Sequence, residues 1–508
     1  MKITAAILVI VATLALALED GVIRAPIIRN PRQGNALEVA RKRYQSMQKR
    51  QLERRADEFP APLYNDQGSQ YLINVDIGSP AQTFAVTLDT GSADLWVPST
   101  SCPASNCPFS RFNTQQSSSF KTLDKPFGIQ YGIGSVNGTY ATDTVTVGGA
   151  TINNQQFGLA SITQDILQPN PSAGDAGSSA SGSNSSSGDP VEANGILGMG
   201  YPSLTQANSQ GEGAYNPFVF NLAAQGVIKD PVFSIFLNSI SETGWAGEIM
   251  LGGIDDSKYT GELNYLPVAS LTARASSTNS SSGGNSGYYY WMVYGQGLGV
   301  KNSNTGNNPG WKLREVGAYI LDTGTTLTYL PTSVASDIVA AFAGPDGFAL
   351  DRQSGVFIVD CATAKSPARF ELVMSQSSKV SASPLVLSVP AKELVIPIDT
   401  SSADTATTCM FGIAPLGGSG GIGANMYLIG DSVLRSAYMV FDMGQNRVGL
   451  AATKDLGGTV SINGTESSAE PATSDASNTS SSSSIFHKRN FILTLGALGI
   501  TTLAMASF

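Results

Sequence analysis

One short pattern occurs twice in this chain and places an aspartate in the same setting each time. Residues 88–98 read LDTGSADLWVP, and residues 321–331 read LDTGTTLTYLP. In each copy the aspartate, Asp89 or Asp322, is followed by Thr-Gly and another hydroxyl residue. An aromatic, an aliphatic and a proline then follow at matching distances. Two carboxylates presented in the same way are the groups that acid–base chemistry on a shared water molecule requires.

The spacing behind the two motifs is also duplicated. Gly198, in an Ile-Leu-Gly sequence, follows Asp89 by 109 residues, and Gly430, in Leu-Ile-Gly, follows Asp322 by 108. A single Asp-Thr-Gly could be an ordinary turn, with Asp as a cap and Gly at positive φ. A repeated motif with a repeated interval instead predicts two similar lobes, each of which supplies one Asp.

The residues next to the acids suit this chemistry. The glycines at 91 and 324 let the backbone approach closely. The adjacent hydroxyl residues are predicted to orient the carboxylates and brace the two turns; they are Thr90, Ser92, Thr323 and Thr325. Two carboxylates held together cannot both ionise cheaply, so they share a proton at mildly acid pH. The ionised one can take a proton from water while the other donates to a carbonyl, which predicts peptide hydrolysis without a covalent intermediate.

The amino-acid composition excludes several classes of catalytic and binding site. The chain of 508 residues has one histidine, His487, which lies in a segment that we predict to be removed. This excludes a Ser-His-Asp triad, a Cys-His dyad and a His-ligated zinc site for the mature protein. We expect no metal and no cofactor. A net charge of −9 argues against nucleic acid as a partner, because such a surface needs clustered Lys and Arg.

Strand patterns dominate the body and predict an all-β fold with few helices. Four β-branched or aromatic runs are the clearest strands, at 71–77, 84–88, 144–147 and 232–237. The best short helices are expected at 216–225 and 333–342. Ser-, Gly- and Asn-rich inserts at 169–190 and 276–287 cannot bury enough apolar surface to order themselves, so we expect exposed loops.

The N-terminal end is read as targeting and processing sequence. Residues 1–17 combine Lys2, an apolar run and Ala15-Leu16-Ala17, which is typical of a secretory signal peptide. Residues 18–55 are basic and contain dibasic pairs ending at Arg50 and Arg55, so we predict a propeptide that ends at one of them. A basic pro-segment could lie over an acidic cleft and hold it shut.

The C-terminal end reads as an anchor. Residues 457–484 form a Ser/Thr-rich stalk, and 485–508 end in an apolar tail, which is typical of a GPI-attachment signal that is removed. A tail-anchoring helix is the alternative. We expect lipid attachment within about 478–482, and a protein on the extracellular face of the plasma membrane or in the cell wall. Between the processed ends, residues 56–484 hold 17 basic and 35 acidic residues, a balance near −18 that suits acid pH.

Cysteines and sequons fit a secreted protein. An even cysteine count in an oxidising compartment implies disulfides, and three pairings of the four are possible. The short spacing favours Cys102–Cys107 together with Cys361–Cys409. Five Asn-x-Ser/Thr sequons are candidate glycosylation sites; they are Asn137, Asn184, Asn279, Asn463 and Asn478. Asp94, close to the first motif, is predicted to be a solvated surface acid.

Taken together, these motifs resemble a pepsin-type aspartic endopeptidase over about 70–452. The resemblance implies a bilobal pepsin-like fold, with an N-terminal β-lobe at 56–240, a C-terminal β-lobe at 241–456 and the active-site cleft between them. It identifies Asp89 and Asp322 with the catalytic pair. It also implies a flap hairpin at 129–135, with Trp96 bonded to the flap tyrosine. The implied substrate-binding residues are Gly91, Tyr131, Gly132, Ile133, Gly324 and Thr326.

Within that family the motifs and the Ser-rich anchored stalk are most similar to the GPI-anchored yapsin group of fungi, which cuts at basic residues. Ile133 stands where that group tends to place an acid, and favours broader, apolar-leaning cleavage. The expected partners are protein or peptide substrates and a GPI lipid, and the expected state is a monomer. A non-catalytic peptide-binding protein and a structural wall glycoprotein are the competing functions.

Overall fold

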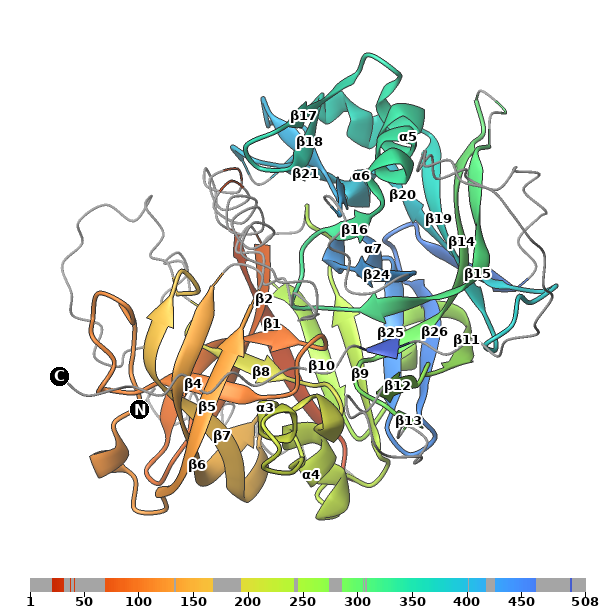
Figure 1. Cartoon of the computed structure of the whole chain (residues 1–508). Helices are drawn as coiled ribbons and strands as arrows, with labels where there is room; N and C mark the ends of the chain where they lie inside the picture. Colours follow the sequence, from red (N-terminus) through yellow and green to blue (C-terminus); the bar gives the residue numbers. More distant parts are fainter. Residues whose placement is uncertain are drawn as a thin grey trace, which may run out of the picture.

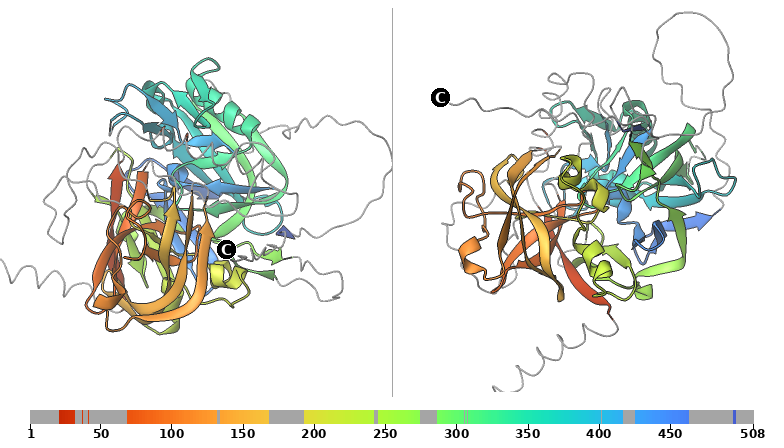
Figure 2. Two further views of the ribbon diagram at one scale, coloured as in Figure 1. Left: turned by 60° about the vertical axis from the view of Figure 1, so that its left-hand side comes forward. Right: turned by 60° about the horizontal axis from the view of Figure 1, so that its bottom comes forward.

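The computed structural model describes residues 21–31, 37, 41, 69–131, 134–167, 193–241, 245–273, 286–304, 306, 308–400, 402–416, 425–462 and 494–495. Strands dominate these residues, which confirms the predicted all-β class. Figure 1 shows two β-rich lobes: β4 to β7 form one side of the molecule, and β14, β15, β19 and β20 with helix α5 form the other. In both turned views of Figure 2, the orange strands of the first lobe lie apart from the green and cyan strands of the second lobe.

A 13-stranded sheet builds the first lobe and the base of the molecule. Its middle joins strands from distant parts of the chain, since β1 pairs with both β10 and β2, and β9 pairs with β25. The strands in sheet order are β11 (Tyr259–Pro267), β26 (Arg447–Thr453), β25 (Ala437–Asp442), β9 (Val232–Leu237), β10 (Trp245–Leu251), β1 (Ile23–Pro31), β2 (Ser69–Ile77), β3 (Gln82–Asp89), β8 (Ile196–Gly198), β4 (Leu95–Pro98), β7 (Ala150–Gln164), β6 (Ser135–Val147) and β5 (Lys121–Gln130).

An eight-stranded sheet forms most of the second lobe. In order it contains β23 (Ile413–Pro415), β16 (Thr328–Leu330), β24 (Met426–Ile429), β15 (Gly310–Leu321), β14 (Met292–Asn302), β19 (Ala368–Ser375), β20 (Leu385–Pro390) and β27 (Thr459–Ile462). A four-stranded sheet lies beside it, in the order β17 (Phe348–Asp351), β18 (Val356–Val359), β22 (Cys409–Phe411) and β21 (Val395–Pro397).

The remaining elements are short. A three-stranded sheet contains β13 (Ser286–Gly287), β12 (Leu271–Ala273) and β28 (Thr494–Leu495). The α-helices whose bounds lie within the described residues are α3 (Gln206–Ser209), α4 (Phe218–Ala224), α5 (Thr332–Ala343), α6 (Ala391–Leu394) and α7 (Asp431–Leu434). Helix α5 buries one apolar face, including Ile338 and Phe342, as a 3.6-residue period requires. Within the described residues, no helix is both long and apolar enough to span a membrane.

The same three-strand arrangement occurs in both lobes and explains the duplicated spacing. In the first lobe β8 lies between β3 and β4, parallel to β3 and antiparallel to β4. In the second, β24 lies between β15 and β16 in the same senses. Asp89 consequently faces Gly198 across the β3–β8 pair. The long interval behind each motif is the length of chain that returns to insert this middle strand.

The predicted strands and helices agree with the structure: the four strand segments fall in β2, β3, β6 and β9, and the two helices are α4 and α5. The second lobe extends beyond 456, because Thr459–Ile462 pairs with β20 as strand β27 inside the predicted stalk. Strand β1 lies within the predicted propeptide 18–55. The predicted signal peptide, and residues 169–190 and 276–285 of the two inserts, lie outside the described residues.

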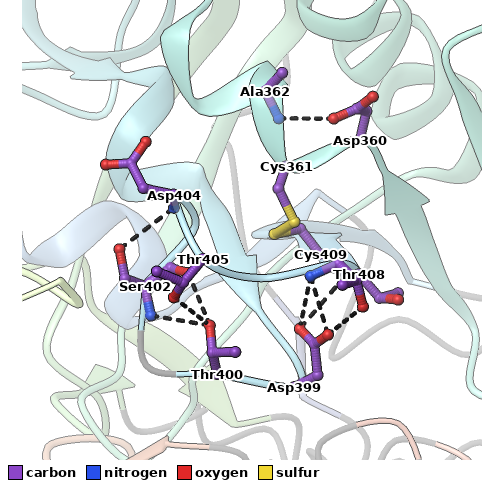
Figure 3. The surroundings of a disulfide bond; sticks show 11 residues. Asp360, Cys361, Ala362, Asp399, Thr400, Ser402, Asp404, Thr405, Thr408 and Cys409 are labelled. Carbon is purple, nitrogen blue, oxygen red and sulfur yellow. Dashed lines mark hydrogen bonds between the residues drawn. A yellow bond between two sulfur atoms is a disulfide. The ribbon is translucent and has the colours of Figure 1, made fainter.

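Both disulfides have the local pairing that the sequence favours. Cys102 and Cys107 are joined within a five-residue separation. Cys361 and Cys409 are joined across a separation of 48, and tie the short 3-10 helix that follows β18 (Cys361–Lys365) to the start of β22. Figure 3 shows this second bridge next to Asp399, which accepts hydrogen bonds from the Thr407 and Thr408 N–H groups. The bridge therefore fixes the edge sheet of the second lobe.

Candidate active site

The two aspartates lie at the ends of equivalent strands and face each other. Asp89 is the last residue of β3, and Asp322 directly follows β15. A Cβ added to Gly91 would lie 2.5 Å from Asp322 Cγ, and one added to Gly324 would lie 2.5 Å from Asp89 Oδ1. Both distances are far shorter than van der Waals contact, so only glycine lets each turn approach the opposite carboxyl. Both carboxyls are almost completely buried.

Each carboxyl is held by its own turn in the same way. The Gly91 N–H donates to Asp89 Oδ1 at 2.8 Å, and the Ser92 hydroxyl donates to Oδ2 at 2.6 Å. In the second lobe the Gly324 N–H donates to Asp322 Oδ1 at 2.9 Å, and the Thr325 hydroxyl donates to Oδ2 at 2.7 Å. Two donors in fixed positions set the plane of each carboxyl. The structure thus brings all of these predicted residues together.

The turns are also tied to each other across the lobes. The Thr90 hydroxyl donates to the Leu321 carbonyl at 2.7 Å and accepts from the Thr323 N–H at 3.0 Å. The Thr323 hydroxyl donates to the Leu88 carbonyl at 2.8 Å and accepts from the Thr90 N–H at 3.2 Å. All four bonds are buried and join residues more than 230 positions apart. The spacing of the two carboxyls is therefore fixed by the backbone on both sides.

The pKa values of the two aspartates are raised to different extents. Burial raises the pKa of both carboxyls. For Asp89, hydrogen bonds from Ser92, Asp322 and the Gly91 N–H oppose burial and favour the ionised form. For Asp322, the charge of Asp89 adds to burial, so its pKa lies well above the usual value. The two carboxyls therefore titrate as a coupled pair, in which the surroundings favour the proton on Asp322 over Asp89.

A β-hairpin lies at the position predicted for the flap. Strands β5 and β6 pair antiparallel up to Gln130 and Ser135, and the Tyr131 N–H donates to the Gly134 carbonyl at 2.8 Å. The Trp96 indole N–H donates to the Tyr131 hydroxyl at 2.8 Å, and both side chains are buried. Of the other residues predicted to bind substrate, Gly132 and Ile133 lie outside the described residues.

The remaining residues predicted to bind substrate or glycan lie in different parts of the structure. Thr326 is buried in the turn after Asp322, and its carbonyl accepts from the Ser432 N–H at 2.9 Å. Asn137 is exposed on β6 of the flap hairpin, as a glycan acceptor must be. The other four sequons, at Asn184, Asn279, Asn463 and Asn478, lie outside the described residues.

The prediction for Asp94 is wrong, because its carboxyl is buried rather than solvated. It accepts hydrogen bonds from the Tyr140 hydroxyl at 2.6 Å, the Tyr215 hydroxyl at 2.7 Å and the Gln206 N–H at 2.8 Å. Burial raises the pKa of Asp94, and the three donors oppose that rise. The residue joins the segment after the first Asp turn to β6 and to α3. Its partners are distant in sequence, so the local motif alone gave no sign of this role.

Sequence reasoning also missed Tyr290. This side chain is buried, and burial together with the charges of Asp322 and Asp89 raises its pKa. The aromatic run at 288–291, YYYW, was the available signal. Among the residues that the structure describes, no group of three or more His, Cys, Asp or Glu is arranged to hold a metal ion.

Comparison with known proteins agrees with this geometry. The family model described as eukaryotic aspartyl protease matches residues 70–453. Mucorpepsin of Rhizomucor miehei is 31% identical over 385 residues, covering 75% of this chain and 78% of that protein. Gastricsin of Oryctolagus cuniculus is 30% identical over 387 residues, covering 75% and 81%. A probable aspartic-type endopeptidase, opsB of Aspergillus oryzae, is 28% identical over 452 residues, covering 87% and 79%. The matched region contains both Asp turns.

Proposed function

The chain belongs to the eukaryotic aspartyl protease family and is an aspartic endopeptidase, and we propose that Asp89 and Asp322 are its catalytic pair. The observation that carries this proposal is the mirrored setting of the two carboxyls, each held by a glycine N–H and a hydroxyl. Peptide bonds in protein substrates are the reactants, and the acidic balance of the body supports work at low pH.

The chemistry follows from the single proton on the pair. A water molecule between the carboxyls loses a proton to the charged Asp89 as its oxygen bonds to the scissile carbonyl carbon. Asp322 gives its proton to the carbonyl oxygen, which forms a tetrahedral diol with no charge left on that oxygen. Collapse of the diol breaks the C–N bond as the proton held by Asp89 passes to the leaving nitrogen. One diol hydroxyl returns a proton to Asp322, which forms the product carboxyl group and restores the single proton on the pair. The donors around each carboxyl keep it oriented throughout.

Hydrolysis of a denatured protein by the processed enzyme tests this assignment. Asp89→Asn and Asp322→Asn should each reduce the rate at about pH 3 to 6 by at least about a thousandfold, because the pair acts as a unit. Asp404→Asn is the matched control, since this side chain is 73% exposed. Full activity in either dyad variant would refute the assignment. A wild type that binds peptide without cutting it would favour the binding protein.

For specificity we propose a preference for apolar side chains over basic ones. Tyr131 belongs to a buried apolar cluster that also includes Phe127, Ile129, Ile166 and Leu167. The charge of Asp94 acts on Tyr131, but the Asp94 carboxyl already accepts three hydrogen bonds and so offers little to a lysine or arginine. Cleavage of a peptide library by the processed enzyme tests this preference. Enrichment of Lys or Arg at the cut would instead support a yapsin-like processing protease.

We further propose that the protein is made as a zymogen, secreted and attached by GPI. Three contacts of residues 18–55 support the pro-segment: β1 pairs within the large sheet, Leu37 packs against the second lobe, and Arg41 lies 3.6 Å from Asp351. Two disulfides support an oxidising compartment. Release of the protein from cells by phosphatidylinositol-specific phospholipase C tests the anchor, and retention after treatment would contradict it. Rescue of a deletion phenotype by Asp89→Asn would favour a structural wall glycoprotein.

A further inference from the structure

Trp291 lies at the contact between the two lobes, outside both Asp motifs. It directly precedes β14 and is fully buried. Its ring packs 4.5 Å from Tyr201, 5.6 Å from Phe233 and 5.2 Å from Phe441, measured between centroids. A large ring so enclosed has few alternative positions, so its polar atoms are fixed in place.

The backbone of Trp291 contacts the strand that delivers the second aspartate. The Leu321 N–H donates to the Trp291 carbonyl at 2.9 Å. Leu321 ends β15, and Asp322 is the next residue. The position of Trp291 therefore helps to define where β15 stops and the second Asp turn starts.

The side chain of Trp291 contacts the first aspartate through one residue. The indole N–H donates to the Met199 carbonyl at 2.8 Å. The Met199 N–H in turn donates to the Asp89 carbonyl at 2.8 Å. Met199 follows the middle strand β8 and is itself fully buried. A chain of three hydrogen bonds thus runs from the second Asp strand, through Trp291 and Met199, to the backbone of Asp89.

We propose that Trp291 is a positioning residue, which fixes the separation of the Asp89 and Asp322 carboxyls through its indole N–H. This link holds the Leu321 N–H and the Asp89 carbonyl, whereas the threonine hydroxyls donate to the Leu321 and Leu88 carbonyls, so the two sets of bonds use different backbone atoms. The inference rests on the proposed function, since it concerns the spacing of the proposed catalytic pair. The competing account is that the bond only satisfies a buried donor, in which case its loss would change stability alone.

The test compares three forms of the processed enzyme. Trp291→Phe removes the N–H and part of the ring, and replacement of the indole by its benzothiophene isostere removes the N–H while keeping the shape. Trp311→Phe is the matched control, because Trp311 is a mostly buried tryptophan near the opposite end of β15. We expect kcat to fall about tenfold in both Trp291 forms with KM changed less than about twofold, since only the reacting groups are misplaced.

Two further readouts separate positioning from packing. If the carboxyls move apart, the charge of Asp89 acts less on Asp322, so the high-pH limb of the kcat profile should move to lower pH. Affinity for a peptide inhibitor with a tetrahedral carbinol should fall in parallel with kcat/KM. Parental kcat and profile in the isostere would overturn the inference even if Trp291→Phe does not fold. Activity in Asp89→Asn or Asp322→Asn would instead overturn the catalytic pair itself.

Discussion

At the scale of single residues, the pKa of Asp322 is raised further than that of Asp89 although the hydrogen-bond donors of the two carboxyls are equivalent. Each has one glycine N–H and one hydroxyl, from Ser92 for Asp89 and from Thr325 for Asp322. The hydroxyl bonds lower the pKa of the acid that accepts them. Because the two hydroxyls bond different carboxyls, removal of the Ser92 hydroxyl and removal of the Thr325 hydroxyl should shift different limbs of the pH–rate profile.

Ser92→Ala should move the low-pH limb of kcat/KM to higher pH by about one unit. The lost bond stabilises the ionised form of Asp89 and is of a type that contributes about 1.5 kcal/mol, while one pKa unit corresponds to about 1.4 kcal/mol. Thr325→Ala should instead move the high-pH limb upward, because it removes the same support from Asp322. Profiles of the two variants that shift the same limb would contradict separate protonation of the pair.

Asp322→Asn should make stability less sensitive to rising pH. The pKa of Asp322 is raised in the folded protein, so the folded state holds a proton that the unfolded chain has released. Its favourable contribution is present below the unfolded pKa and is lost as pH rises through the folded pKa. Urea unfolding at about pH 3 to 7 should therefore show a steeper loss for the parent than for the variant. Parallel curves would contradict the raised pKa.

The sequence predicted the residues around the two acids because the motifs that contain them are local and repeated. Asp94, Tyr290 and Trp291 escaped prediction because their partners are brought by topology. The Asp94 carboxyl, for example, meets Tyr140 and Tyr215, which are far along the chain. A motif written in consecutive residues carries no information about such contacts.

At the scale of elements, the sequence predicted the repeated interval behind each Asp motif. It did not predict the strand pairing in the three-strand unit that causes this interval. The distances to Gly198 and Gly430 indicated two similar lobes, whereas the insertion of β8 and β24 between other strands is visible only in the structure. Strand β1 was not predicted, because a short stretch in a basic segment has little strand signal. It is stabilised by neighbours on both sides, β10 and β2.

Arg24→Ala should let the precursor convert at higher pH. Arg24 contacts Asp255 and lies 3.0 Å from Glu248. Burial tends to raise the pKa of Asp255, but hydrogen bonds from Ser257 and Arg24 outweigh it and hold the pKa below its usual range. This support is therefore present above the unfolded pKa and is lost as pH falls through the folded pKa. The pair is partly exposed, so its contribution is at most about 1 kcal/mol.

Conversion rates of the secreted precursor across acid pH measure this effect. A few-fold faster conversion is expected in Arg24→Ala where the parent is still slow. Lys365→Ala is the control, because Lys365 lies 3.1 Å from Asp404 in an exposed pair elsewhere on the second lobe. Equal rates for Arg24→Ala and the parent at every pH would show that β1 is not held by this pair.

At the scale of the whole molecule, the lobes share one sheet. The boundary predicted between residues 240 and 241 falls in the connection from β9 to β10, which pair with each other. Phe233 on β9 stacks on Phe441 on β25, so first-half and last-half residues form one core. The spacing of the motifs could not predict this shared core. The repeated motifs mark only the two Asp turns, whereas the shared core is formed by strands of the 13-stranded sheet.

Removal of the Cys361–Cys409 bridge should destabilise the protein more than removal of Cys102–Cys107. The first closes a separation of 48 residues and the second a separation of five. In the loop-entropy model the longer closure contributes about 4 kcal/mol, and the shorter clearly less. Melting of the double-serine variants measures the difference. A larger loss from the short bridge would show that local structure, rather than loop entropy, dominates.

The pH dependence of kcat/KM for the processed enzyme tests the central claim most directly, because its two limbs report the protonation of the two carboxyls. Shared protonation of Asp89 and Asp322 predicts a bell-shaped curve confined to acid pH, whose high-pH limb disappears together with activity in Asp322→Asn. A rate that stays level into alkaline pH, or a curve that Asp322→Asn leaves unchanged, would contradict the account.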